Sequence, residues 1–315
     1  MLTIIGPTAC GKTTLAAHVA ATLTRRGTAA EIISGDSRQV YRGMDIGTGK
    51  DLCDYSVNHD GITTDIPYHL IDICAPGEKY NIFRFQEDFL KAYTDITSRH
   101  AYPILCGGSG LYVESVVRNY RLSPVPKDEA LREELSHKTM EELTAILMRL
   151  KEQNNSDMHN KTDVDSPQRA IRAIEIEQYN ALHPVADRPF PDITTLVVGV
   201  DIPRDVRRAR ISARLKQRID EGMTDEIRRL LDDGVRAEDL IYYGLEYKYV
   251  TEYVIGQRTY DDMLTQLEIH IHQFAKRQMT WFRGMERRGV NIHWIDGTQP
   301  LDRRTEDVIR LLGKR

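Results

Sequence analysis

The chain has 315 residues, of which 41% are hydrophobic and 29% charged, and its formal net charge is −4 at pH 7. This length and apolar content allow a sizeable core. A negative net charge excludes a globally basic nucleic-acid binder, so any nucleic-acid partner must be recognised through local basic clusters. No apolar run approaches the roughly 18 residues that span a bilayer, and the N-terminus has no signal-peptide pattern. We therefore expect no membrane partner and a cytoplasmic location.

The four cysteines are Cys10, Cys53, Cys74 and Cys106. They lie far apart, form no CxxC pair and have no clustered histidines beside them. We expect neither disulfide bonds nor a structural metal site.

Short apolar runs alternate with long helical patterns along most of the chain. The first run, residues 2–5, leads through a glycine-rich loop into a helical pattern at 13–23. Further runs lie at residues 31–33, 104–106, 195–200 and 292–295. This alternation is typical of a parallel sheet wrapped by helices. We predict an α/β fold of the P-loop NTPase type, with helices on both faces of the sheet.

The alternation stops between about Pro124 and Pro191, where helical patterns at 127–150 and 167–179 follow one another without a strand. Asp165 or Ser166 can cap the second of these helices, with Pro167 at its first position. We predict a P-loop core over residues 1–122, a helical insertion over 123–191, and a mostly helical completion of the core over 192–315.

The sequence GPTACGKT at residues 6–13 matches GxxxxGK[ST] and stands between a strand and a helix, as that motif requires. Backbone N–H groups and Lys12 offer positive charge to a diphosphate, and the Thr13 hydroxyl can join a Mg²⁺ shell. The motif leaves ATP, GTP and an organic diphosphate open as ligands. The residues predicted to bind the diphosphate are Gly6, Pro7, Thr8, Ala9, Cys10, Gly11, Lys12, Thr13 and Thr14.

Three segments resemble other nucleotide motifs. NKTD at residues 160–163 resembles a guanine-binding motif, but it follows a polar stretch and not an apolar strand. Asp201 follows an apolar run, as a Walker B aspartate would, whereas glycines follow the run at 104–106. GGSG at 107–110 lacks dinucleotide-fingerprint spacing. We interpret NKTD as chance, the ATPase case as incomplete, and GGSG as a loop close to the phosphate motif.

Asp36 follows the second predicted strand, in the stretch DSRQVYRGMDIGTGK at 36–50. Ligands of open α/β sheets bind at the carboxyl ends of the strands, so Asp36 should face the same crevice as the phosphate motif. A carboxylate there can act as a general base, or it can be a helix-capping or turn residue. Both interpretations stay open.

Four arginines, Arg207, Arg210, Arg214 and Arg218, are spaced by three and four residues, which places them on one face of a helix. This face predicts contact with an anion, and a solvated basic face is the alternative. Arg207 and Arg218 are predicted to contact RNA phosphates. Other basic residues could extend this footprint: Arg169, Arg172, Lys276 and Arg277.

Seven segments together resemble the tRNA dimethylallyltransferase family, which isopentenylates the adenosine immediately 3′ of the anticodon. In chain order they are GPTACGKT at 6–13, DSRQVYRGMDIGTGK at 36–50, HLID at 69–72, PILCGGSGLY at 103–112, PQRAIRAIE at 167–175, RISAR at 210–214 and QFAKRQMTWFRG at 273–284. They span nearly the whole chain.

The resemblance implies transfer of a dimethylallyl group from dimethylallyl diphosphate to N6 of that adenosine, in tRNAs that read codons starting with U, with Mg²⁺ as the cofactor. It implies a general base at Asp36, a hydroxyl near the bridging oxygen and Mg²⁺ at Thr13, and a diphosphate contact at Arg214. The insertion would bind the anticodon arm of the tRNA, and we expect a monomer. The matched tRNA-contact positions are Asp36, Ser37, Arg38, Gln39, Ser109, Gln168, Arg169, Ala170, Ile171 and Arg172.

The sequence departs from the family pattern at Cys10, Gly49 and Ser109, and more strongly at 243–248 and at His272. These last two segments belong to the half of the chain that would face tRNA. Two other functions fit the phosphate motif: a small-molecule or nucleotide kinase that binds ATP, and a non-catalytic RNA-binding P-loop protein.

Overall fold

The computed structural model describes residues 1–122, 124–154, 164–183 and 190–313, so the NKTD segment at 160–163 lies outside the described residues. The chain forms two compact units. Unit 1 combines Met1–Asn119 with Asp192–Arg315, and unit 2 is Tyr120–Pro191. Each unit has an apolar core of its own.

Unit 1 is built on a parallel sheet of six strands in the order β5-β2-β6-β1-β7-β8. The strands are β1 (Leu2–Ile5), β2 (Ala30–Ser34), β5 (Tyr68–His69), β6 (Tyr102–Gly107), β7 (Leu196–Asp201) and β8 (Ile292–Asp296). The central strands are buried along almost their whole length, which explains why they read as continuous apolar runs. The predicted α/β fold with a parallel sheet is confirmed.

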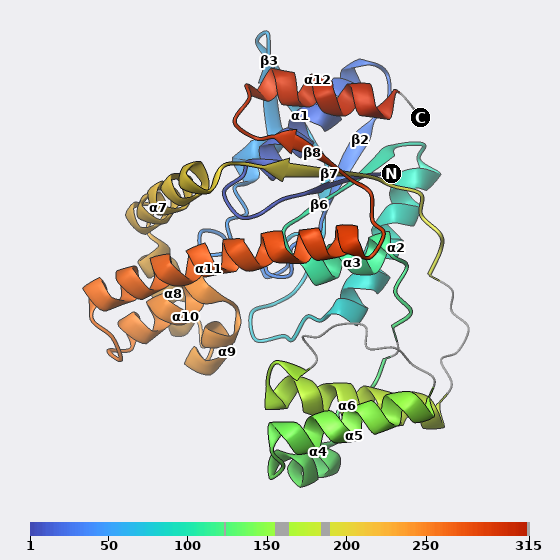
Figure 1. The fold of residues 1–315 in the computed structure, drawn as a ribbon. Helices are drawn as coiled ribbons and strands as arrows, with labels where there is room; N and C mark the ends of the chain where they lie inside the picture. Colours follow the sequence, from blue (N-terminus) through green and yellow to red (C-terminus); the bar gives the residue numbers. More distant parts are fainter. Residues whose placement is uncertain (123, 155–163, 184–189, 314–315) are drawn as a thin grey trace. The chain divides into compact units, whose positions relative to one another are not determined.

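Helices cover both faces of this sheet (Figure 1). On one face α1 (Lys12–Arg25) packs against α12 (Leu301–Leu312), and on the other lie α2 (Ile82–Ser98), α3 (Gly110–Val117) and α11 (Tyr260–Arg287). Leu15 of α1 and Val308 of α12 share one apolar core with the strand residues Ile4 and Val198. The C-terminal helix α12 was not predicted from the sequence.

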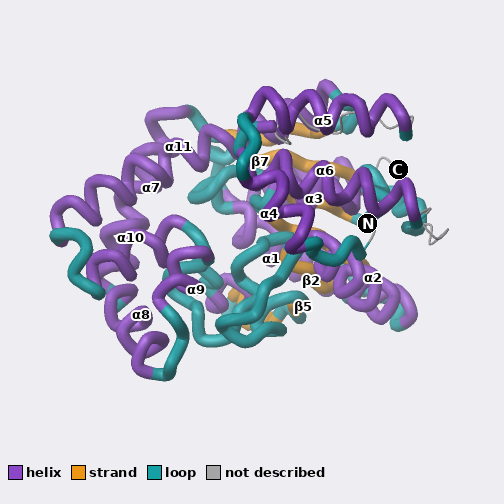
Figure 2. The backbone as a smooth tube through the Cα atoms, turned by 90° about the horizontal axis from the view of Figure 1, so that it is seen from below, coloured by secondary structure: helices purple, strands orange, loops and turns teal. Residues whose placement is uncertain are grey.

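Four shorter helices group beside the amino-terminal half of α11 (Figures 1 and 2). They are α7 (Arg204–Asp220), α8 (Met223–Asp232), α9 (Ala237–Tyr242) and α10 (Leu245–Val254). The helical pattern from 204 to 231 is broken at Gly222, whose φ of +98° is a left-handed conformation that favours glycine. This break turns α8 away from α7.

A small two-stranded sheet follows the 3₁₀ helix η1 (Leu52–Tyr55). Its strands β3 (Ser56–His59) and β4 (Ile62–Asp65) pair antiparallel. Asp60 and Gly61 form the turn with φ values of +51° and +79°, the left-handed pair that a tight hairpin requires. This hairpin was also missed in the sequence.

Unit 2 contains α4 (Glu129–Ser136), α5 (Met140–Gln153) and α6 (Pro167–Leu182). Thr139 and Glu142 form a capping box that starts α5, so the predicted pattern 127–150 is two helices and not one. The Ser166 side chain accepts the Arg169 N–H with Pro167 at the first helical position, and the predicted cap is thereby confirmed.

The chain leaves and rejoins unit 1 at neighbouring residues. The side-chain amide of Asn119 donates a hydrogen bond to Oδ1 of Asp192 at 3.0 Å. Unit 2 is therefore an insertion whose two ends adjoin one place on unit 1. Its bounds, residues 120 and 191, lie close to the boundaries predicted at 123 and 191.

Among the described residues, no helix combines the length and the apolarity that crossing a membrane requires. All four cysteines are free thiols in the structure.

Candidate active site

Three loops meet at the carboxyl edge of the sheet: the phosphate loop (residues 6–13), the post-β2 segment (residues 35–50) and the loop after β6 (residues 107–109). Their strands are neighbours, because β6 lies between β1 and β2. The backbone N–H of Ser37 donates to Ser109 Oγ at 3.1 Å, and a Cβ on Gly107 would lie 2.5 Å from the carbonyl oxygen of Gly35. The structure thus places Asp36 and the glycine-rich loop beside the phosphate loop.

The phosphate loop has the backbone conformation that its glycines allow. A Cβ on Gly6 would lie 2.5 Å from the Cys10 sulfur and 3.1 Å from the Val200 carbonyl oxygen. Gly11 has a φ of +80° and precedes the first residue of α1, Lys12. The first N–H groups of a helix have no intrahelical acceptor and carry partial positive charge. Together with the Lys12 ammonium they form a site for phosphate oxygens.

Gln278 of α11 joins the phosphate loop to the loop after β6. Its side-chain oxygen accepts the Thr8 N–H at 2.8 Å, and its amide nitrogen donates to the Gly108 carbonyl at 2.8 Å. The side chain is buried, at 7% exposure. Gln278 therefore fixes the distance between two of the three loops. In the sequence this residue belongs to the QFAKRQ segment that matches the family, and no local signal predicts its role.

Asp36 is partly exposed and makes one short contact within its own segment. Its Oδ1 accepts the Arg38 N–H at 2.8 Å, which is an Asx turn. The interpretation of Asp36 as a turn residue is therefore correct. A carboxylate has about four acceptor positions, so this hydrogen bond leaves capacity for a proton from a substrate.

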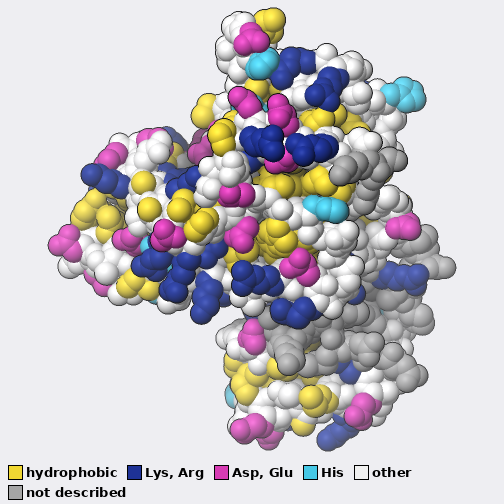
Figure 3. Space-filling model, turned by 45° about the horizontal axis from the view of Figure 1, so that its top comes forward, with side chains coloured by type: hydrophobic (Ala, Val, Ile, Leu, Met, Phe, Trp, Pro, Cys, Tyr) yellow, Lys and Arg dark blue, Asp and Glu magenta, His cyan; other side chains and the backbone are white. Residues whose placement is uncertain are grey.

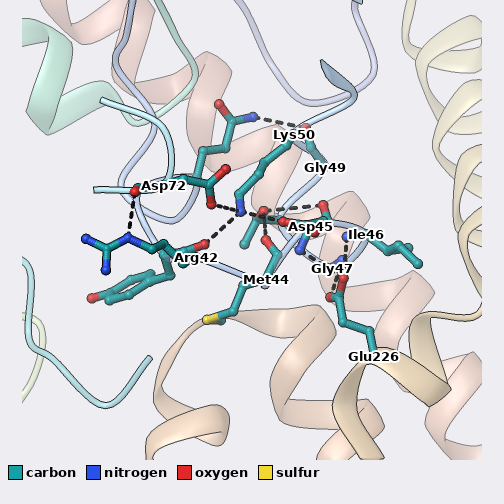
Figure 4. A network of polar contacts seen from close by, with 12 residues as sticks. Arg42, Met44, Asp45, Ile46, Gly47, Gly49, Lys50, Asp72 and Glu226 are labelled. Atoms are coloured by element: carbon teal, nitrogen blue, oxygen red, sulfur yellow. Dashed lines mark hydrogen bonds and ion pairs between the residues drawn. The ribbon is translucent and has the colours of Figure 1, made fainter. Parts of the chain in front are cut away.

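The post-β2 segment is clamped by Glu226 of α8 (Figure 4). The Glu226 carboxylate accepts the backbone N–H groups of Asp45, Ile46 and Gly47 at 2.9, 2.7 and 3.1 Å. The Tyr247 hydroxyl donates to the same carboxylate at 2.5 Å. Glu226 is 2% exposed. The buried Glu226 side chain thus fixes the backbone of the post-β2 segment, which contains Asp36.

Lys50 holds the same segment from within. Its ammonium is buried and donates to the Tyr41 carbonyl at 2.7 Å and to Asp45 Oδ1 at 2.5 Å, and it also pairs with Asp72 (Figure 4). A buried ammonium needs such partners, since desolvation penalises its charge. Lys50 closes a polar network and is not free to bind substrate.

The arginine face of α7 divides between the interior and the surface. Arg214 pairs with Asp51, and Arg218 lies 3.7 Å from Asp51 and 3.8 Å from Glu246. Burial, with the like charge of Arg214, lowers the pKa of Arg218. At 9% exposure Arg218 does not reach RNA phosphates, and the structure does not support that prediction. Arg207 is partly exposed and stays a candidate.

Arg218 also explains the departure at Gly49. A Cβ on Gly49 would lie 1.7 Å from Nη2 of Arg218, and the φ of Gly49 is +63°. The guanidinium occupies the space that a side chain at 49 would need. An alanine at residue 49 would clash with the Arg218 guanidinium as long as that side chain stays where it is.

A small pocket lies between the phosphate loop and α7. Its lining combines the phosphate-loop backbone with basic, acidic and apolar side chains: Thr8, Ala9, Ile211, Arg214, Leu215, Arg218, Glu246 and Ile271. Burial raises the pKa of Glu246, and the charge of Arg218 partly offsets this effect. The pocket thus places two arginines and an apolar wall next to the phosphate loop.

The predicted tRNA-contact residues fall into two groups. Asp36, Ser37, Arg38, Gln39 and Ser109 lie together at the carboxyl edge of the sheet in unit 1. Arg38 lies over the ring of Tyr242, with its Cζ 5.2 Å from the centroid, and donates to the Tyr242 carbonyl at 3.2 Å. Figure 3 shows basic and acidic side chains interspersed over the face in view, in keeping with the small net charge.

The second group lies on α6 of unit 2. Gln168 and Arg169 are exposed, whereas Ala170 and Ile171 pack into the core of this unit. Arg172 donates to the Val125 carbonyl at 2.8 Å and pairs with Glu175. Side-chain contact with tRNA at Ala170 and Ile171 is therefore not supported, and the exposed pair at 168 and 169 is the better candidate.

The described residues contain no cluster of three His, Cys, Asp or Glu side chains that could hold a metal ion. The Thr13 hydroxyl lies beside the thiol of Cys106. Burial raises the pKa of this thiol to about 12, so it is protonated at neutral pH and does not bind metal as a thiolate. One hydroxyl beside a phosphate loop fits Mg²⁺, which protein sites often hold mainly through substrate phosphates and water.

The parallel sheet, the phosphate loop after β1 and the carboxylate after β2 define the class: this is a P-loop α/β protein with a helical insertion. The IPP transferase family model matches residues 39–285. The chain is 58% identical over 302 residues to tRNA dimethylallyltransferase 2 of Bacteroides fragilis, covering 96% of this chain and 94% of that protein.

It is 57% identical over 312 residues to tRNA dimethylallyltransferase 2 of Phocaeicola vulgatus, covering 99% and 97% of the two chains. The solved full-length tRNA isopentenylpyrophosphate transferase of Bacillus halodurans aligns with a TM-score of 0.68 and 31% identity, over 99% of this chain and 95% of that one. The chain belongs to the IPP transferase family.

Proposed function

We propose that this protein transfers a dimethylallyl group from dimethylallyl diphosphate to N6 of the adenosine immediately 3′ of the anticodon, in tRNAs that read codons starting with U. Diphosphate is the second product. Family membership over nearly the whole chain gives the reaction class. The observation that carries the mechanism is the meeting of the phosphate loop with the Asp36 segment at one edge of the sheet.

The phosphate loop holds the diphosphate as a leaving group. The backbone N–H groups after Gly6 and the ammonium of Lys12 bind its oxygens, and Arg214 at the pocket wall adds a second cation. Negative charge grows on this group as the bond between its oxygen and C1 of the prenyl chain breaks. Fixed donors that meet the growing charge lower the barrier without reorganising.

Asp36 accepts the proton of the nucleophile. The N6 lone pair forms the new bond to C1 while the C1–O bond breaks, and the N6 proton passes to the carboxylate. The Arg38 N–H and the clamp at Glu226 keep the carboxylate and its segment in place. Positioning of this kind is worth several powers of ten in rate.

The divalent cation would be Mg²⁺, held by the Thr13 hydroxyl and by oxygens of the bound diphosphate. When bound, it neutralises charge on the diphosphate. No carboxylate cluster of the described residues competes for this role.

The tRNA contacts would come from Asp36 to Gln39, from Ser109 and from the exposed side of α6. The target adenine must leave its stack to reach Asp36, at a cost of roughly a few kcal/mol that backbone contacts offset. We expect the protein to act as a monomer in the cytoplasm, where its tRNA substrate is found.

The test incubates the purified protein with Mg²⁺, radiolabelled dimethylallyl diphosphate and unmodified tRNA that reads a codon starting with U. We expect label at one adenosine, 3′ of the anticodon, and release of one diphosphate per label. Consumption of ATP with a metabolite, and no label in tRNA, would instead establish a kinase.

A further inference from the structure

Arg304, in the first turn of α12, lies against the phosphate loop. Its Nη1 is 3.4 Å from the position that a Cβ on Gly11 would occupy. Its charge is also close enough to interact with the buried thiol of Cys10. The C-terminal helix therefore brings a guanidinium to the loop that forms the N-terminus of α1, from a position almost 300 residues away in the sequence.

Two nitrogens of this guanidinium lack hydrogen-bond partners. Within the described residues, Nε and Nη1 of Arg304 are buried and have no hydrogen-bond partner. Asp296 is an acidic residue whose charge acts on Arg304, but its carboxylate accepts hydrogen bonds from the Thr298 N–H and hydroxyl and from the Gln299 amide. An arginine has five N–H donors in a planar arrangement, and burying them without acceptors is costly.

The surrounding charge increases this cost. Burial lowers the pKa of Arg304, and the like charge of Arg210 on α7 lowers it further. Lys12 starts α1 directly after Gly11. Two cations, Lys12 and Arg304, thus lie at the end of the phosphate loop where α1 begins, and among the described residues no carboxylate is hydrogen-bonded to the buried nitrogens of Arg304. An anion bound there would offset this positive charge.

We propose that Arg304 is a further anion-binding residue, whose guanidinium donates to oxygens of the diphosphate held in the phosphate loop. This inference rests on the proposed function for the identity of the anion. Arginine suits the role because its planar donors match phosphate oxygens in pairs. The C-terminal helix α12 then not only covers the sheet but also supplies a residue of the diphosphate site.

The experiment measures binding of inorganic pyrophosphate with Mg²⁺ to the full chain by calorimetry, and thermal unfolding without ligand. The variants are Arg304→Met and Arg304→Lys, with Arg303→Met as the matched control. Arg303 is the adjacent arginine on the same helix, but it is 58% exposed and lies 3.9 Å from Asp307.

We expect Arg304→Met to weaken pyrophosphate binding by about 10- to 100-fold, the scale of charge-assisted hydrogen bonds. Arg304→Lys should fall between it and the wild type, and Arg303→Met should bind normally. The unfolding temperature of ligand-free Arg304→Met should equal or exceed that of the wild type, since two buried nitrogens without acceptors are removed. A structural role predicts the opposite change.

Normal pyrophosphate binding by Arg304→Met would overturn the inference. A lower unfolding temperature for both Arg304 variants, with equal losses of binding, would also overturn it in favour of a structural role. The prenyl-transfer assay is separate. If the wild type transfers no prenyl group but Arg304→Met still loses pyrophosphate affinity, the proposed function fails and the anion site stands.

Discussion

A single carboxylate at position 36 illustrates how little of a residue's chemistry its local contacts reveal. Its Oδ1 closes an ordinary turn onto Arg38. Only the neighbouring strand ends show that the same carboxylate belongs to the crevice of the phosphate loop. The two interpretations left open by the sequence are therefore compatible.

Replacing Asp36 with asparagine separates these two roles. The amide oxygen can still accept the Arg38 N–H, but it is not a useful base at neutral pH. We expect turnover to fall by about 10² or more, with tRNA affinity within a few fold of the wild type. Single-turnover transfer and a filter-binding assay measure the two quantities.

Asp220→Asn is the matched control, since Asp220 is an exposed aspartate near the end of α7. It should behave as the wild type. Full turnover in Asp36→Asn would remove the general-base role and leave only the turn.

The placement of the phosphate loop and of Asp36 at one edge of the sheet could be predicted from sequence, because a motif and a strand end mark them locally. Gln278 and Glu226 could not, because their partners lie 270 and about 180 residues away. The arginine spacing gave the correct helix face for α7. The spacing could not predict that the Arg218 side chain is buried against Gly49, because this burial depends on how α7 packs.

At the scale of elements, the Glu226 clamp links α8 to the post-β2 segment. Glu226→Gln keeps one acceptor oxygen but replaces the other with a donor that faces backbone N–H groups. We expect a loss of about 1 to 3 kcal/mol in the free energy of unfolding, the scale for unsatisfied buried donors. We also expect a fall in kcat, because Asp36 is carried by the freed segment.

Denaturant unfolding and single-turnover transfer provide the measurements. Glu221→Gln, at an exposed position just before α8, is the control. If Glu226→Gln is as stable as the wild type, the three N–H contacts make no net contribution to the free energy of unfolding.

Unit 2 has a pH-sensitive element in Glu175. Burial raises its pKa, but hydrogen bonds from Arg132, from the Asp128 N–H and from Arg172 outweigh burial and lower the pKa to about 2. A carboxyl group with a lowered folded-state pKa contributes stability above its ordinary pKa, and this contribution is lost as the pH falls from about 5 towards 2.

Glu175→Gln should therefore destabilise the protein at pH 7 by about 3 kcal/mol, the value of the pKa difference. The difference from the wild type should shrink steadily below pH 5. Denaturant unfolding at several pH values, with proteolysis of residues 120–191 as a local probe, measures it. Glu134→Gln changes an exposed neighbour and should have no effect. A difference independent of pH would contradict the ion-pair explanation.

Helices and strands could be predicted from the sequence where burial imposes a pattern of apolar residues. The four central strands β1, β2, β6 and β7 read as apolar runs because both of their faces are covered. The β3–β4 hairpin was missed because its strands are largely exposed and carry no apolar alternation. The Asp60–Gly61 turn was its one local signal.

On the scale of the whole molecule, the fold and the insertion followed from the order of elements along the chain. The insertion and the sheet each have a separate core. A linker of two or three glycines between Asn119 and Asp192 should therefore leave unit 1 folded, since these residues already share a hydrogen bond.

We expect this shortened protein to unfold cooperatively and to bind pyrophosphate with Mg²⁺ about as tightly as the intact chain. Its affinity for tRNA should fall at least tenfold, because contacts from α6 are lost. Calorimetry and filter binding measure the two ligands. Unchanged tRNA affinity would assign RNA recognition to unit 1 alone.

The hydrogen bond between Asn119 and Asp192 has a consequence for how this lineage can diversify. A segment whose ends are held together can gain or lose residues without shifting the register of any strand. Natural variation in length should therefore be better tolerated there than at the joints of the sheet. Under the proposed role of unit 2 in tRNA binding, changes of its length would alter which RNAs are accepted and leave the prenyl-transfer site of unit 1 unchanged.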